Sequence, residues 1–180
     1  MLFSLQPITA QNKKTDETTY NPNAVKDSSK KSIKSAVIAN IDDATIRINY
    51  YSPAIRGRNI WGGLIPYNEV WVTGAHSATN IEINQPISVN GKKITAGKYA
   101  LFTIPGKEDW IFIINKNYQQ HLSDDYDEKE DIIRVTLKPV LTHQPLERLQ
   151  YFIVSSGKKK GTIALQWEKI SLELPFTLIN

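Results

Sequence analysis

The hydrophobic positions of this chain repeat with a period of two over most of its length after the first 32 residues. Ile46, Ile48 and Tyr50 alternate with polar residues, and Ile81 and Ile83 repeat the pattern. Successive side chains of a strand point to opposite faces of a sheet, so this spacing gives each strand one buried and one solvated face. The pattern therefore predicts β-strands, and no long segment shows the 3.6-residue period of a helix.

Turn residues separate the predicted strands. Asn90-Gly91 follows the apolar run 87–89 and accepts the positive φ angles of a type I′ turn, which predicts a hairpin. Residues 105–109 separate a strand at 99–104 from one at 110–115, whose sequence is apolar enough for burial on both faces. Further strands are expected over residues 132–137, 149–154, 163–167 and 170–176.

About nine or ten strands with short connections predict an all-β domain, built as an antiparallel β-sandwich or as a more barrel-like arrangement. The longest irregular segment runs from Asn117 to Asp131, with a helical turn expected at 118–122 and an acidic second half. Loops of this length in a compact domain are usually functional or mobile.

The first 32 residues differ from the rest in composition. Residues 1–10 combine a short apolar run with Ile8-Thr9-Ala10, which fits the small-residue pattern before a signal-peptide cleavage site. We therefore expect a signal-peptide remnant and a periplasmic or secreted protein, the alternative being a disordered N-terminus. Residues 11–32 are polar and predict a flexible leader, which leaves 33–180 as a single β-sandwich domain.

Composition narrows the classes of function. The formal net charge of +4 is modest and its lysines are scattered, whereas nucleic-acid binding needs a clustered basic face, so we expect no nucleic-acid partner. The absence of cysteine excludes disulfides, thiolate metal sites and cysteine nucleophiles. No apolar run approaches the ~18 residues of a membrane-spanning helix.

The candidate functional site is the glycine-rich segment 56–76, which lies between two predicted strands. We expect it to bring Arg56, Arg58, Trp71, Thr73 and His76 into one concave patch. Arginine and threonine would donate hydrogen bonds, and tryptophan would offer a flat wall for stacking. This combination predicts binding of a polar small molecule, such as a glycan or an envelope component.

Each of these residues also has an ordinary structural interpretation. Surface arginines often pair with a nearby acid, and tryptophans such as Trp61, Trp71 and Trp110 are usually core residues of a sandwich. The three histidines show no metal-ligand spacing, and the acidic residues 124–131 lack the spacing of a calcium loop. We therefore expect no metal and no cofactor, and a solvated acidic loop rather than a cation site.

Two other functions remain open. His76 would serve a hydrolase as general base with an acid from residues 124–131, although no Gly-x-Ser-x-Gly nucleophile elbow is present. Alternatively, the chain is an assembly protein without a small-molecule site, in which an exposed strand edge pairs with a second copy or with an envelope protein.

Several segments resemble the bacterial family known as domain of unknown function 2911. The likeness spans about residues 45 to 177. It is carried chiefly by Trp61-Gly62-Gly63-Leu64-Ile65-Pro66-Tyr67, Thr73-Gly74-Ala75, Asn90-Gly91-Lys92-Lys93, Leu101-Phe102-Thr103-Ile104-Pro105-Gly106 and Tyr126-Asp127-Glu128.

This resemblance implies an exported, β-rich protein of a Bacteroidetes-type bacterium, and it brings no established activity. Many relatives carry arginine where Val72 lies and asparagine where His76 lies, which weakens any mechanism that needs a catalytic histidine. We therefore expect a binding or structural protein rather than an enzyme.

Overall fold

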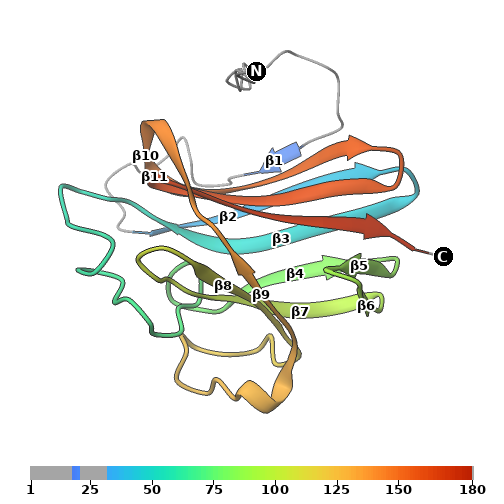
Figure 1. The fold of residues 1–180 in the computed structure, drawn as a ribbon, viewed down its shortest axis with the longest axis horizontal. Helices are drawn as coiled ribbons and strands as arrows, with labels where there is room; N and C mark the ends of the chain where they lie inside the picture. Colours follow the sequence, from blue (N-terminus) through green and yellow to red (C-terminus); the bar gives the residue numbers. More distant parts are fainter. Residues whose placement is uncertain (1–17, 21–31, 180) are drawn as a thin grey trace, which may run out of the picture.

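The computed structural model describes residues 18–20 and 32–179 and places its strands in two antiparallel sheets (Figure 1). One short 3₁₀ helix, Glu128–Glu130, lies between β8 and β9. The strands are β1 (Thr18–Tyr20), β2 (Ser32–Ile41), β3 (Ala44–Pro53), β4 (Thr79–Ile83), β5 (Ile87–Val89), β6 (Lys92–Ile94), β7 (Gly97–Ile104), β8 (Trp110–Asn115), β9 (Asp131–Leu137), β10 (Val140–Gly157) and β11 (Lys160–Leu178).

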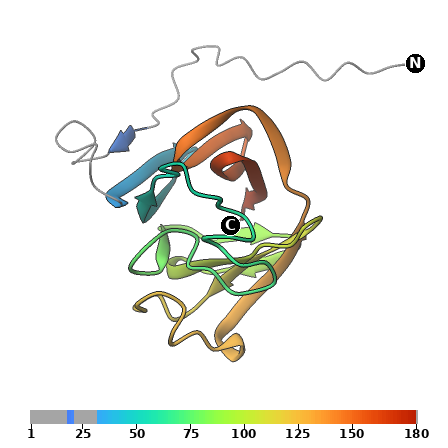
Figure 2. The same cartoon turned by 90° about the vertical axis from the view of Figure 1, so that its left-hand side faces the viewer.

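The larger sheet has the order β1-β2-β3-β4-β7-β8-β9, and the smaller sheet has the order β10-β11-β5-β6. Seen end-on, β10 and β11 form one layer and β7 to β9 the opposite layer (Figure 2). This confirms the predicted antiparallel sandwich, which does not close into a barrel. The sheets meet at one corner, where Ala54 bridges to Arg148 and the N–H of Ile55 donates to the carbonyl oxygen of Glu147 at 2.8 Å.

The hydrophobic positions that alternate in the sequence are the positions whose side chains are buried in the core. Ile46, Ile48 and Tyr50 of β3 are buried, and so are Ile81 and Ile83 of β4 beside them. Burying one such aliphatic side chain contributes about 1.5–3 kcal/mol, so two neighbouring strands fix the inner face of the larger sheet. β8 is buried on both faces except at Ile111, as its apolar sequence predicts.

The expected hairpin joins β5 to β6. Asn90 has a φ of 46° and Gly91 a φ of 78°, the positive values that a type I′ turn requires. β6 is an edge strand of three residues whose exposed Lys92 and Lys93 discourage pairing with another chain.

Two expectations need correction. The two strands expected at 163–167 and 170–176 are one strand, β11, which continues through Glu168 at a φ of 52°. The helical turn expected at 118–122 does not form, because the side-chain oxygen of Asn117 accepts from the N–H of Gln119 at 3.3 Å and sets an Asx turn instead. β1, which lies within the segment expected to be a leader, pairs with β2 in antiparallel register.

The predicted signal-peptide remnant, residues 1–10, lies outside the described residues. In the described ranges 18–20 and 32–179, no helix is long and apolar enough to cross a bilayer.

Candidate functional site

The glycine-rich segment connects β3 to β4 and forms one end of the molecule (Figure 1). It is fastened to β7 in the middle of its course. Trp71 and Thr103 exchange two backbone hydrogen bonds of 2.8 and 3.0 Å, and the N–H of Asn68 donates to the carbonyl oxygen of Pro105 at 2.8 Å. This long connection is therefore held in place by the larger sheet.

All four tryptophans of the chain meet here, two from the segment itself and two from β8 and β11. The ring centroid of Trp61 lies 5.8 Å from that of Trp71, 4.7 Å from Trp110 and 5.7 Å from Trp167, each in an edge-to-face arrangement. Trp71 and Trp167 stack at 5.8 Å with an interplanar angle of 25°. Each such ring pair adds about 0.5–1.5 kcal/mol to stability beyond the contribution of its burial. The cluster therefore forms a stable floor under the rest of the segment.

Thr73 is strained and completely buried. Its φ of 53° lies in the left-handed region, which a β-branched residue rarely adopts. The hydroxyls of Thr79 and Tyr151 donate to the carbonyl oxygen of Thr73 at 2.9 and 3.0 Å, and the Thr73 hydroxyl donates to the carbonyl oxygen of Trp71 at 3.1 Å. Burial raises the pKa of Tyr151 well above its usual value, so its hydroxyl stays a neutral donor.

The glycine after Thr73 is required by close packing. A Cβ on Gly74 would lie 2.7 Å from the hydroxyl oxygen of Thr79 and 3.2 Å from the carbonyl oxygen of Tyr51. The Gly74 carbonyl oxygen also accepts from the indole N–H of Trp71 at 3.0 Å. Residues 71–74 therefore form a hydrogen-bonded unit, in which backbone strain is maintained by contacts from three other elements.

A cleft of about 430 Å³ opens above this unit. Arg58, Trp71 and His76 all line it, so the structure brings together three of the five predicted site residues. The exposed side chains of Leu64 and Leu122 also line it, at 41% and 39% exposure. The remaining lining residues are Ser32, Pro53, Ile65, Pro66, Glu69, Val70, Val72, Gly74, Ala75, Ser123 and Trp167.

Arg58 is positioned by its own turn. Its guanidinium donates from Nη2 to the carbonyl oxygen of Ala54 at 2.6 Å and from Nε to that of Ile55 at 3.1 Å. The side chain is nevertheless exposed, and its remaining N–H groups can serve a ligand. Glu69 lines the same cleft, so its lining includes one acidic side chain beside the basic side chain of Arg58.

His76 stands where the segment meets the long acidic loop. Its carbonyl oxygen accepts from the N–H of Leu122 at 2.7 Å, and Ser77 forms a β-bridge with His121. The exposed His76 ring packs edge-on against Tyr51, with centroids 5.1 Å apart. No carboxylate of the described residues lies in ion-pair range of His76.

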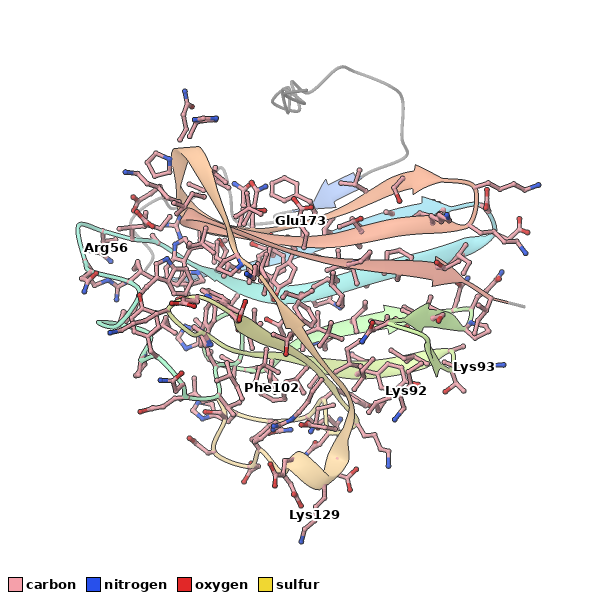
Figure 3. All side chains as sticks on the ribbon, viewed as in Figure 1. Arg56, Lys92, Lys93, Phe102, Lys129 and Glu173 are labelled. Carbon is pink, nitrogen blue, oxygen red and sulfur yellow. The ribbon has the colours of Figure 1, made fainter. Side chains whose placement is uncertain are left out.

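The other two predicted residues lie elsewhere. Thr73 is buried beneath the cleft and does not line it. Arg56 lies at the tip of the connection from β3, as Figure 3 shows, and its backbone N–H donates to Glu147 at 2.9 Å. Trp71 reaches the cleft with only 7% of its surface exposed, so it offers little of its ring to a ligand.

Three lining residues of the cleft were not predicted from the sequence: Leu64, Glu69 and Leu122. Leu64 and Glu69 lie inside the predicted segment, and their proximity to its aromatic residues was a usable signal. Leu122 belongs to the loop after β8, and nothing in the neighbouring sequence indicates that it lines the cleft.

The acidic loop is held by contacts with one basic side chain, that of Arg134. Arg134 donates to Asp131 and to the hydroxyl of Tyr126, each at 2.7 Å, and that hydroxyl donates to Asp131 at 2.6 Å. Asn115 donates to the second oxygen of Asp131 at 2.7 Å. Burial, followed by the hydrogen bond to Asp131, raises the pKa of Tyr126 to about 12.

Two further acidic residues of this loop lie near basic side chains. Glu128 lies 3.6 Å from Arg134, and Glu130 lies 3.8 Å from Lys116. In the part of the chain that the structure describes, no three His, Asp or Glu side chains gather as a metal site.

Comparison with curated proteins and with solved structures gives no significant match. The family model for "Protein of unknown function (DUF2911)" matches residues 32–176, which cover almost all the described strands. This confirms the resemblance seen in the glycine-rich segment and the strand sequences. The chain belongs to the DUF2911 family of β-sandwich proteins.

Proposed function

We propose that the cleft binds a small ligand with one apolar face and one polar or anionic edge, such as a sugar ring of a glycan or another envelope component. The observation that carries this proposal is the convergence on one cleft of Arg58, Trp71 and His76 with two exposed leucines, Leu64 and Leu122. The leucines would contact the apolar face, and Arg58 would donate to oxygen atoms at the edge.

The strained floor supports a binding role. Thr73 and His76 both have positive φ, and backbone strain of this kind costs about 1–3 kcal/mol and is concentrated at functional sites. The tryptophans and the Thr73 contacts hold the cleft open before any ligand arrives, so binding would need little ordering. A hydrolase is less well supported, since the His76 side chain forms no ion pair among the described residues and its ring contact is with Tyr51.

We also propose that the protein acts outside the cytoplasm. The support is the small-residue pattern at Ile8-Thr9-Ala10 and the exported character implied by the family resemblance. N-terminal sequencing of protein recovered from the periplasm or the medium tests this, and cleavage after Ala10 is the expected result.

The binding proposal is tested by a thermal-shift screen of envelope sugars and short peptides, repeated on Leu64→Glu and Arg58→Ala. A ligand that raises the melting temperature of the wild type should lose this effect in both variants, because each removes a contact at the cleft. Arg47→Ala is the matched control, since Arg47 is exposed on β3 away from the cleft. A screen without hits, or hits that both cleft variants retain, would contradict the proposal.

One observation favours an assembly protein as a second candidate. Val140 and Leu141, at the start of β10, are 56% and 76% exposed, and β10 is an edge strand of the smaller sheet. An exposed apolar edge can pair with a second copy of the chain. Light scattering of the wild type and of Leu141→Lys tests this: a dimer that the substitution dissociates would support it.

A further inference from the structure

We propose that a polar groove on the outer face of the larger sheet binds an acidic oligosaccharide through its carboxylate groups. Two adjoining hollows of about 200 and 340 Å³ form this groove and share Ser77, Ala78 and Asn80. The first is lined by Lys34, Asn49, Tyr50 and Tyr51, and the second by Lys98, Tyr118, Gln119, Gln120 and His121.

The strand register places these side chains on one face. Lys34 lies opposite Tyr51, Asn49 lies two residues before Tyr51 and opposite Asn80, and Lys98 lies two residues before the partner of Asn80. The groove therefore crosses β2, β3, β4 and β7. Three inter-strand steps of ~4.8 Å give a span of roughly 14 Å, which is longer than one monosaccharide.

The charge of the groove favours an anionic occupant. Lys34 and Lys98 lie at its two ends, and neither hollow is lined by a carboxylate. Farther along the sheet, Glu82 lies opposite both Arg47 and Lys98, so Arg47 offsets this carboxylate and the two groove lysines remain in excess. Asp124 is the acid beside His121, at 3.5 Å. Two ammonium groups at opposite ends of the groove suit carboxylates on different sugar units of one chain better than one compact anion.

The remaining polar groups suit sugar hydroxyls. Asn49 donates to the side-chain oxygen of Asn80 at 3.1 Å, which leaves the second group of each amide available. Gln120 is 4% exposed, and its side-chain oxygen has no hydrogen-bond partner among the described residues. A buried acceptor without a partner is unfavourable, and a sugar hydroxyl that reaches it would supply the missing donor.

Aromatic rings complete the groove. Tyr51 and Tyr118 are half-buried, and the ammonium group of Lys98 lies 5.1 Å from the centre of the Tyr118 ring. Aromatic rings beside hydrogen-bonding amides offer the apolar and polar contacts that the two sides of a sugar need. This groove is separate from the proposed cleft: the bridged segments 76–78 and 120–122 form the wall between them.

Isothermal titration calorimetry with the full chain tests this inference, using tetragalacturonate and a hyaluronan tetrasaccharide as acidic probes and cellotetraose as the neutral one. We expect at least one acidic probe to bind, with an affinity that falls as salt rises and exceeds that for cellotetraose. The double variant Lys34→Gln/Lys98→Gln should weaken this binding at least tenfold.

The matched control is Lys92→Gln/Lys93→Gln, which removes the same charge from β6 of the smaller sheet, where neither lysine lines the groove (Figure 3). It should leave the affinity within twofold, and Leu64→Glu should do the same because the cleft is a different site. Urea midpoints of all variants check that each still folds. No binding of either acidic probe, equal binding of cellotetraose, or an equal loss in both double variants would overturn the inference.

Discussion

The hydroxyl of Tyr151 donates a 3.0 Å hydrogen bond to the carbonyl oxygen of Thr73, 78 residues away along the chain. It links the smaller sheet to the floor of the cleft, and its partner is a residue with strained backbone. The second donor to that carbonyl oxygen, Thr79, comes from the larger sheet. The conformation of the glycine-rich segment is therefore set by both layers of the sandwich.

Removing this hydroxyl should destabilise the protein without unfolding it. Tyr151→Phe loses one buried hydrogen bond while Thr79 still satisfies the carbonyl oxygen, so we expect a loss of about 0.5–1.5 kcal/mol in the free energy of unfolding. Urea denaturation measures it. Tyr67→Phe, at a half-buried tyrosine of the same segment, is the control and should change the free energy by less than ~0.5 kcal/mol. Equal losses in both variants would contradict this role of Tyr151.

The backbone at His76 should tolerate asparagine and reject valine. The φ of His76 is 63°, a conformation that asparagine adopts readily and β-branched residues avoid. We expect His76→Asn to change the free energy of unfolding by less than ~0.5 kcal/mol and His76→Val to reduce it by about 1–2 kcal/mol. Thermal denaturation of both variants distinguishes them; a tolerated valine would show that this strain is not retained in solution.

The tryptophan cluster offers a matched pair of substitutions. The indole N–H of Trp71 donates to Gly74, whereas the buried N–H of Trp61 has no partner within the described ranges. Trp71→Phe should therefore cost about 1 kcal/mol more than Trp61→Phe, since only the first loses a buried hydrogen bond. Equilibrium unfolding of the two variants gives this difference. A larger loss for Trp61→Phe would contradict it.

Stability should fall above pH 10 in part because of Tyr126. Its folded pKa of about 12 exceeds the ordinary tyrosine value of 10.0, so its contribution is complete below pH 10 and is lost as the pH rises toward 12. We expect the urea midpoint of Tyr126→Phe to fall less steeply between pH 9 and 12 than that of the wild type. Tyr50 and Tyr151 also have raised pKa values, so some slope should remain. Parallel slopes would be the contrary result.

The strands were predictable because their signal is local. Alternation marks β3 and β4, and Asn90-Gly91 marks the β5–β6 turn from neighbouring residues alone. The continuity of β11 was not predictable, because Glu168 carries no sequence sign that it accepts a φ of 52°.

The candidate site was predictable only in part, for a similar reason. Its glycine-rich segment identifies itself by composition, and Arg58, Trp71 and His76 line the cleft as expected. From the sequence we expect Thr73 to be a surface hydrogen-bond donor, but long-range contacts from Thr79 and Tyr151 hold it in the core. Leu122 lies at the cleft because Ser77 and His121 form a β-bridge. Such a tertiary pairing cannot be predicted from the sequence around either residue.

The most direct test of the cleft is NMR of the four indole N–H signals during titration with hits from the thermal-shift screen. Trp71 and Trp167 line the cleft, whereas Trp110 does not. A ligand in the cleft should shift the signals of Trp71 and Trp167 in a saturable way and leave that of Trp110 in place. Saturable binding that moves neither Trp71 nor Trp167 would contradict the assignment of this cleft as the binding site.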